Sequence, residues 1–475
     1  MNSTYLPSCV QSILFSFRPC FTAPSFENFV ALTLGWILAR GPHTVSRAIM
    51  AARAFGWTRR RHHATLYRFL ARARWCVDDL GEVLFRLLLP FLPEQIEAVF
   101  DDTLCHRSGP QLFGGGMHHD CSRSTYGGGT GRRKVLSFGH NWVVLSIWVP
   151  YPWSRERGVA VPVLFRLYRS PKRCPKAQYR KRTELACEML RILDSWLPEN
   201  RRLDLAADRE YACQTLLRDV SPDVVFTGPM LLNAALCKPG RIPVQRTGRP
   251  RKKGLPLPSP EALARKTSRP WQEMTATLYG RQVTLLTKTW IAAWPRVLGQ
   301  RPVRIVLTRD PKGRWVDRVY FSTDVERTPQ AILERYARRW SLEVTFRNVK
   351  QDLGLEDPRN GWWRRKHGSK RRPKKAGPEP RGNRGRLAIE RTVPLIFMAH
   401  AFVIAWYLRH GNPQGDARRA RRLRPWDRQK TEPAFGDMLR ALRRTIWRRR
   451  LSQNPLLRPV SAKVESLLPM LEAAA

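Results

Sequence analysis

The sequence predicts an α/β protein with an all-α N-terminal part and an inserted strand-rich subdomain. From residue 26 to about residue 92, apolar residues recur at three- and four-residue steps, as in amphipathic helices. From Ile96 onward, β-branched and aromatic runs alternate with helical segments. Between residues 229 and 302 a loop-rich, proline-rich stretch followed by a strand-like part interrupts this alternation.

Composition narrows the class of protein. The 475 residues are 43% hydrophobic, which supplies a core and makes disorder improbable. The chain has 85 Lys and Arg against 38 Asp and Glu, a formal net charge of +47. Such a field attracts polyanions, above all DNA or RNA, and argues against a small-metabolite enzyme. A GC-rich genome would also supply excess arginine, so the charge alone is weak support for a nucleic-acid partner.

Cysteine usage and hydropathy predict the compartment. The nine cysteines are odd in number and form no C-x-x-C pair, which fits neither a disulfide framework nor a zinc ribbon. The longest apolar run, Val393 to Leu408, contains His400 and is shorter than the ~20 residues of a membrane-spanning helix. We therefore expect a cytoplasmic protein with no membrane segment and no signal peptide.

In chain order, the pattern predicts five regions. They are a helical region at 1–94, the first part of an α/β core at 95–228, the insertion at 229–302, the second part of the core at 303–408, and a basic C-terminal region at 409–475. The core should run strand, strand, strand, helix, strand, helix, strand. The predicted strands are Ile96 to Phe100, Trp142 to Val149, Val159 to Tyr168, Leu203 to Ala207 and Val224 to Phe226, and after the insertion Val303 to Thr308 and Val319 to Ser322.

A long helix follows these strands. Thr328 is a good N-cap and Pro329 fits the first helical position, so we expect a helix from there to about Leu353. Residues 358–386 then hold twelve Lys and Arg against one acid, with many Gly and Pro, which predicts an unfolded basic loop. A buried helix should follow at residues 393–408.

Four polar residues are regularly placed on the helix after Thr328. Tyr336, Arg339, Glu343 and Lys350 fall within roughly 60° of one another on one face. A surface ladder of ion pairs would give a similar pattern. However, Asp102 and Asp208 each end a predicted strand, where site residues of open α/β sheets usually lie.

Two strand-end aspartates and a helix glutamate are suitable ligands for hard divalent ions. Mg²⁺ takes oxygen ligands and shares the rest of its shell with water and phosphate oxygens. Two such ions ~4 Å apart can activate an attacking oxygen and stabilise a leaving one at phosphorus. The sequence therefore predicts a metal site for phosphoryl transfer.

These motifs resemble a known family. Asp102-Thr103, the step Asp208-Arg-Glu-Tyr211 and the run Tyr336-x2-Arg339-x3-Glu343-x6-Lys350 are similar to the DDE transposases of bacterial insertion sequences, in the group with the Y-R-E-K signature. The resemblance covers roughly residues 96 to 408. It implies a ribonuclease-H-like core with the strand-rich insertion before the catalytic Glu.

The resemblance also implies roles for residues and partners. Asp102, Asp208 and Glu343 would be the catalytic metal ligands, binding two Mg²⁺ ions for which Mn²⁺ can substitute, and Tyr336, Arg339 and Lys350 would hold transposon-end phosphates. The partners would be double-stranded DNA, namely terminal inverted repeats and target DNA, with a dimer assembled on DNA. The helical N-terminal region would bind the transposon end, and the protein would be nucleoid-associated in a bacterial cytoplasm.

One ambiguity concerns neighbouring aspartates. Asp101 precedes Asp102, and only one can point into a site because successive strand side chains face opposite ways. We favour Asp102, which directly precedes Thr103.

Weaker motifs remain open. Arg249 and Arg251 flank Pro250 in a basic stretch resembling a minor-groove AT-hook, which could equally be a solvated loop. A tryptophan in the insertion could stack on a flipped base, as in related enzymes, or pack in a core; the candidates are Trp271, Trp290 and Trp294. A zinc site near residues 105–121 is disfavoured because its Cys and His spacing lacks a paired Cys arrangement.

The sequence therefore predicts a transposase that cleaves DNA at transposon ends and transfers the strand to a target. The alternatives are a stand-alone endonuclease or junction resolvase on the same core, and a domesticated, non-catalytic DNA-binding protein. Inverted repeats flanking the gene would favour the transposase.

Overall fold

The computed structural model describes residues 6–57, 62–108, 112–124, 135–154, 156–240, 254–358 and 382–452. Arg249, Arg251 and residues 359–381 of the predicted basic loop lie outside this part. The last residues of that predicted loop are helical instead, because helix α12 already begins at Gly382.

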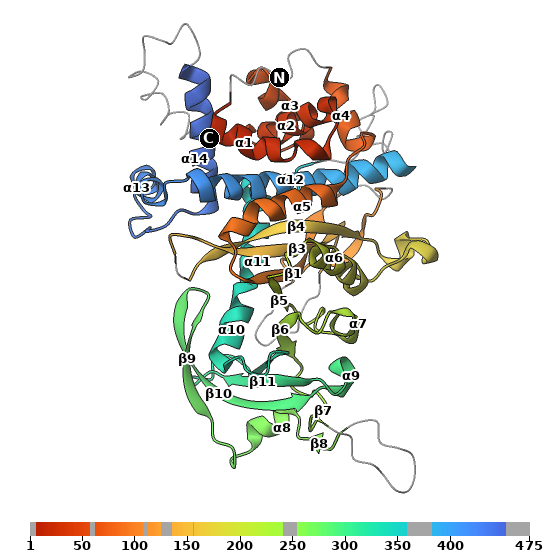
Figure 1. Ribbon diagram of the computed structural model, residues 1–475, viewed down its shortest axis with the longest axis vertical. Coiled ribbons are helices and arrows are strands. Elements are labelled where there is room, and N and C mark those ends of the chain that lie inside the picture. Colours follow the sequence, from red (N-terminus) through yellow and green to blue (C-terminus); the bar gives the residue numbers. More distant parts are fainter. Residues whose placement is uncertain are drawn as a thin grey trace.

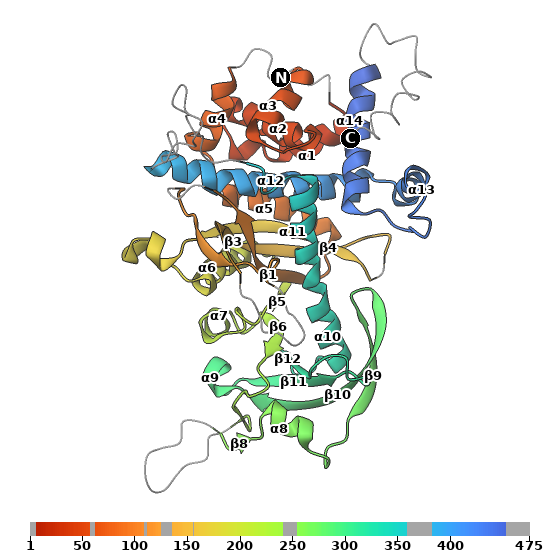
Figure 2. The same cartoon turned by 180° about the vertical axis from the view of Figure 1, so that it is seen from behind.

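The elements form three tiers along the long axis, with helices above, a sheet in the middle and a strand-rich lobe below (Figures 1 and 2). Before residue 95, all the regular elements that the structure describes are helices. Thr44 caps one of these helices by accepting a hydrogen bond from the backbone N–H of Arg47 at 3.2 Å. The helices are α1 Ser8–Ser16, α2 Ala23–Leu38, α3 Val45–Ala54, α4 His63–Ala71 and α5 Val77–Leu88.

The middle tier is a mixed sheet in the order β4-β3-β1-β5-β6. Strand β3 pairs antiparallel with both β4 and β1, whereas β1, β5 and β6 are parallel. The predicted order of elements is confirmed, apart from a short additional strand, β2 Gly116–His119. The bounds are β1 Gln95–His106, β3 Leu136–Pro150, β4 Gly158–Tyr168, α6 Arg182–Trp196, β5 Arg202–Ala207, α7 Gln214–Asp219 and β6 Val225–Met230.

The lower lobe continues this sheet. Strand β12 pairs antiparallel with β6, and β11 and β10 follow, so the predicted insertion is hydrogen-bonded to the core through the β10–β11 pair. Strand β9 forms a hairpin with β10. The bounds are β7 Leu236–Cys237, β8 Pro256–Leu257, α8 Pro260–Arg265, β9 Gln272–Leu278, β10 Arg281–Ala293, α9 Pro295–Leu298, β11 Pro302–Arg309 and β12 Arg318–Ser322.

The predicted long helix exists as two segments, α10 Pro329–Arg338 and α11 Trp340–Asp352. Thr328 caps it as expected, because its hydroxyl accepts from the backbone N–H of Ala331 at 3.2 Å. Arg339 lies at the junction with φ −52° and ψ −35°, which are helical values, so the chain keeps nearly one direction through the break.

Helix α12, Gly382–His410, packs against α1, α2 and α4 on one side and against α5 and β4 on the other (Figure 1). Two further helices, α13 Pro413–Leu423 and α14 Phe435–Ser452, follow it. Among the described residues, α12 alone is long and apolar enough to span a membrane, from Gly385 to His410, but 83% of its apolar window is buried in the protein. Apolar residues of the upper helices, the sheet and α12 form one continuous core.

Candidate active site

The two neighbouring aspartates lie within β1 rather than at its end. Strand β1 continues to His106, because the long strand β3 supplies ladder partners as far as the pair His106 and Gly139. The prediction that Asp102 ends its strand is therefore wrong. The parallel pairing with β5, however, stops at Phe100 and Ala207. Asp101 and Asp208 thus follow directly where β1 and β5 part.

Asp101 and Asp102 face opposite sides, as strand alternation requires. One Asp101 oxygen, Oδ2, accepts from Arg339 at 2.7 Å. Asp102 Oδ2 accepts from Asn141 Nδ2 at 2.6 Å and lies 3.8 Å from Arg182 Nη1. The structure therefore places Asp101, not Asp102, in contact with the helix that carries Glu343.

Arg339 connects two carboxylates. Its guanidinium donates to Asp101 and, at 2.8 Å, to Glu343 Oε1. Burial raises the pKa of Asp101 to about 7, although Arg339 opposes that rise, and Asp102 adds to it. Burial likewise raises the pKa of Glu343, with Arg339 opposing it and the Asp208 carboxylate adding to it. These carboxyl groups are therefore close enough to disfavour one another's charge, which a cation would relieve.

Asp208 follows β5 directly, as predicted, and is exposed. One of its oxygens accepts from the backbone N–H of Arg209 at 2.6 Å. Its charge acts on the pKa of Glu343, of Tyr336 and of Arg339, so it faces the same space as the helix residues.

The remaining two Y-R-E-K residues flank this cluster. The Tyr336 ring lies 5.5 Å from the Arg339 guanidinium and 4.9 Å from the ring of Tyr320. Lys350 Nζ donates to the carbonyl of Leu104 at 2.8 Å and lies 3.4 Å from Glu356. Lys350 is thereby held against β1, two residues beyond Asp102.

Sequence reasoning missed several residues of this region. Asn141 holds Asp102; its only signal was a polar side chain at the edge of an apolar strand. Glu356 pairs with Lys350 and with His106 Nδ1 at 2.9 Å, a contact between segments 250 residues apart that no local pattern could reveal.

Two histidines of residues 105–121 contact side chains within the same stretch. His106 Nε2 lies 2.6 Å from Asp120 Oδ2, and Cys121 lies 3.4 Å from His119 Nδ1. Cys105 is buried.

The tryptophans proposed for base stacking do not reach this site with free faces. Trp290 and Trp294 are each only 8% exposed, and Trp271 lies beneath Lys288 and Arg309. Instead, the exposed Trp340, next to Arg339, contacts Tyr279 with ring centroids 6.0 Å apart.

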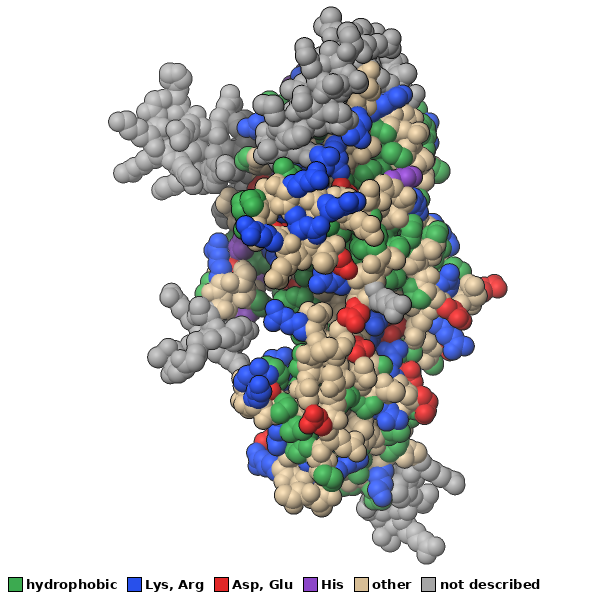
Figure 3. All heavy atoms as spheres, turned by 90° about the vertical axis from the view of Figure 1, so that its left-hand side faces the viewer, with side chains coloured by type: hydrophobic (Ala, Val, Ile, Leu, Met, Phe, Trp, Pro, Cys, Tyr) green, Lys and Arg blue, Asp and Glu red, His purple; other side chains and the backbone are tan. Residues whose placement is uncertain are grey.

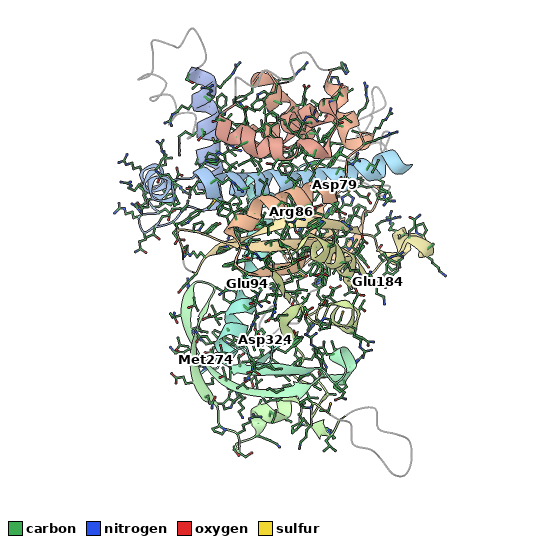
Figure 4. The ribbon with its side chains drawn as sticks, viewed as in Figure 1. Asp79, Arg86, Glu94, Glu184, Met274 and Asp324 are labelled. Carbon is green, nitrogen blue, oxygen red and sulfur yellow. The ribbon has the colours of Figure 1, made fainter. Side chains whose placement is uncertain are left out.

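Figure 4 labels Glu94, one residue before β1, and Asp324, two residues after β12. Figure 3 shows Lys and Arg side chains over much of one face of the molecule, with fewer Asp and Glu.

The donor set fits a hard divalent ion chemically, since all of its members are carboxylates. Within the described residues, though, no three Asp, Glu, His or Cys side chains are grouped as metal ligands. The structure brings Asp101, Arg339 and Glu343 into contact and leaves Asp102 turned toward Asn141. The guanidinium of Arg339 supplies the compensating positive charge between carboxylates.

The protein is strongly basic and has a mixed α/β fold with acidic side chains directly after the last ladder pair of the parallel strands β1 and β5. Residues 16–294 match the family model for the DDE superfamily endonucleases, which is more than half of the chain. The chain belongs to this family. No curated protein matches the chain.

The matched residues include Asp101, Asp102 and Asp208 and end before Glu343. Members of this family are nucleases that generally use divalent metal ions.

Proposed function

We propose that this protein is a transposase that cleaves DNA at transposon ends and transfers the strand to target DNA. One observation carries the proposal: Asp101 and Asp208 directly follow the last ladder pair of β1 and β5, and Arg339 links Asp101 to Glu343 on α11. The strand order β4-β3-β1-β5-β6, with three antiparallel strands followed by two parallel ones, supports a ribonuclease-H-like core. The spacing of Tyr336, Arg339, Glu343 and Lys350 supports the Y-R-E-K group.

In this proposal Asp102, Asp208 and Glu343 hold two Mg²⁺ ions, with Asp101 as the alternative to Asp102. When bound, such ions activate the attacking oxygen and stabilise the leaving oxygen. Arg339 hydrogen-bonds two carboxylates through separate nitrogens, and the same fork can bind two phosphate oxygens. Lys350 and Tyr336 lie on either side and would position the strand.

Double-stranded DNA is the proposed partner, both as terminal inverted repeats and as target. The net charge of +47 supports it because binding would release counterions from many phosphates. We further propose a dimer assembled on DNA, working at the bacterial nucleoid in the cytoplasm.

The test is cleavage of a terminal-repeat duplex in Mg²⁺ by Asp101→Asn, Asp102→Asn, Asp208→Asn and Glu343→Gln. Asp208→Asn and Glu343→Gln should reduce cleavage to background while DNA binding stays near wild type, because a ligand is lost and few phosphate contacts are. The control is Glu261→Gln, an exposed carboxylate on α8, which should cleave normally. Full activity of all four variants would place the site elsewhere.

The Asp101 and Asp102 variants determine which of these two aspartates is the metal ligand. Loss of cleavage in Asp102→Asn with an active Asp101→Asn supports the proposed assignment, and the reverse result assigns the ligand to Asp101. A pre-cleaved 3′-hydroxyl end incubated with a plasmid target then separates the candidates: joined products support a transposase, whereas cleavage without joining supports a stand-alone endonuclease.

A further inference from the structure

The connection between β4 and α6, residues 169–182, is a basic segment beside the candidate site. It holds seven cations and no acid. Lys172, Lys176, Arg180 and Lys181 are all exposed. We call residues 169–182 the β4–α6 segment; it is the gold projection beside α6 in Figure 1, seen from behind in Figure 2.

One end of the β4–α6 segment adjoins a residue that pairs with a neighbour of Asp102, and the other end contacts Asp102 itself. Tyr168, just before it, pairs across the sheet with Asn141, the residue that hydrogen-bonds Asp102. At the other end, Arg182 lies 3.8 Å from Asp102 Oδ2 and donates to Glu210 at 2.6 Å. A ligand bound along this segment would therefore lie next to Asp102.

The segment is ordered rather than a loose solvated loop. It contains two short 3₁₀ turns, Pro171–Arg173 and Lys176–Gln178. Pro171 and Pro175 fix φ at the start of each turn, and backbone hydrogen bonds of 2.9 Å close both. Because the cations are held by a restrained backbone, a ligand that binds them loses less conformational entropy.

Within the described part of the chain, three lysines of this segment are not neutralised by ion pairs, whereas Arg182 pairs with Asp102 and Glu210. Among the described residues, Lys172, Lys176 and Lys181 have no carboxylate partner in an ion pair. Like charges held within one Debye length, ~10 Å at 0.1 M salt, repel one another, so the arrangement costs stability without a bound anion.

The segment also borders a cleft of about 510 Å³. The residues that line it include Arg169, Gln178, Arg180 and Arg386, together with the acidic Asp78, Glu188 and Glu390. Arg169 Nε is buried and has no hydrogen-bond partner in the described part of the chain. A buried guanidinium N–H without an acceptor is costly.

We propose that the β4–α6 segment binds the phosphate backbone of the DNA duplex next to the bond that is cleaved. This rests on the proposed function for the position of that bond, but the binding itself does not. Exposed lysines and arginines on a connection between β4 and α6 fit contact with the phosphate backbone, which is independent of sequence.

The experiment measures binding of a fluorescent, mixed-sequence 30-bp duplex in EDTA over a range of salt concentrations. The variant K172Q/K176Q/K181Q removes three cations of the segment, and the control K266Q/R296Q/K312Q removes three exposed cations of the lower lobe. If each of the three lysines contacts one phosphate, the slope of log K against log salt should fall by ~2.7, since each contact contributes ~0.9. Affinity at 0.1 M salt should fall by about tenfold or more, with the control near wild type.

Unchanged affinity and slope in the segment variant would overturn the inference, and so would equal losses in both triple variants, which would reflect net charge alone. Binding in EDTA does not depend on cleavage. The phosphate-binding role of the segment and the proposed catalytic site can therefore be refuted independently of each other. A segment variant that binds normally while Glu343→Gln abolishes cleavage refutes only the segment's role. A weakened segment variant in a protein whose carboxylate variants all cleave normally refutes only the proposed catalytic site.

Discussion

Arg339 has two possible roles that can be separated by experiment. As a structural residue, it neutralises Asp101 and Glu343; as a site residue, it also binds the DNA strand. The Asp101 side chain is only 15% exposed, so removing Arg339 altogether would leave a largely buried carboxylate without its cation and lower stability. A substitution that keeps the charge is therefore the informative one.

We expect Arg339→Lys to retain a melting temperature near that of the wild type but to slow single-turnover cleavage of a pre-nicked end by about a hundredfold. A point charge replaces a planar fork, and a displacement of ~1 Å at the reacting strand costs about that much. Arg347→Ala, an exposed residue on the same helix, is the control and should cleave normally. Wild-type cleavage rates in Arg339→Lys would show that the role of Arg339 is purely structural.

His400 is a buried residue whose charge should make stability depend on pH. It is fully buried in α12, its ring stacks on Phe435 at 4.3 Å, and neither ring nitrogen has a hydrogen-bond partner among the described residues. Burial lowers its pKa to about 3. The unfolded chain binds a proton near pH 6.5 and the folded chain does not, so the stability present above that pH is lost as pH falls.

We therefore expect the wild type to lose about 2 kcal/mol of unfolding free energy between pH ~8 and pH ~5 through His400 alone. His400→Phe keeps the aromatic stack and should lack this loss. The measurement is urea unfolding of both proteins at the two pH values. Other buried histidines, such as His140, contribute equally to both proteins, so an identical pH dependence in the two would contradict the assignment.

At the scale of elements, local sequence patterns predicted the order of helices and strands more completely than the contacts of the candidate site. Thr328 and Pro329 predicted their helix because capping is a local interaction. The strand β1 extended past Asp102 because β3, more than 30 residues away, offers partners there. The contact of Asp101 with Arg339 spans 238 residues, and helix periodicity could place Arg339 and Glu343 on one face without saying which aspartate they meet.

Close packing of α5 on β4 gives an element-scale prediction. A Cβ at Gly81 would overlap the carbonyl oxygen of Val163 and press on Trp196 at 3.2 Å. Gly81→Ala should therefore push α5 away from the sheet and cost ~1–3 kcal/mol of stability by chemical denaturation. Glu82→Ala, which only loses a surface pair with Arg86, should cost ~0.5 kcal/mol or less. Equal stabilities would mean that α5 adjusts without strain.

At the scale of the whole molecule, hydrogen bonds from side chains to backbone carbonyls connect the upper helices to the C-terminal half. Trp36 Nε1 donates to the carbonyl of Leu353, at the end of the helix that carries Glu343, at 3.0 Å. Arg391 of α12 donates to the carbonyls of Leu70 and Trp75. Arg443 of α14 is buried, and its acceptors include the carbonyl of Ile37 at 2.6 Å. Burial lowers the pKa of Arg443 to about 10, so this guanidinium depends on its acceptors.

These hydrogen bonds predict that residues 95–475 cannot fold without residues 1–94. Removing the N-terminal helices would take these carbonyl acceptors from Arg391 and Arg443 and expose the apolar face of α12 to water, at a cost of ~25 cal/mol per Å² of apolar surface. Residues 95–475 expressed alone should be insoluble or melt without a cooperative transition. Co-expressing residues 1–94 as a separate chain should restore a soluble complex with one transition, because the missing contacts are then supplied without a covalent link. A sharp melt from residues 95–475 alone would instead establish the N-terminal helices as an independently folding domain, free to bind a transposon end apart from the catalytic core.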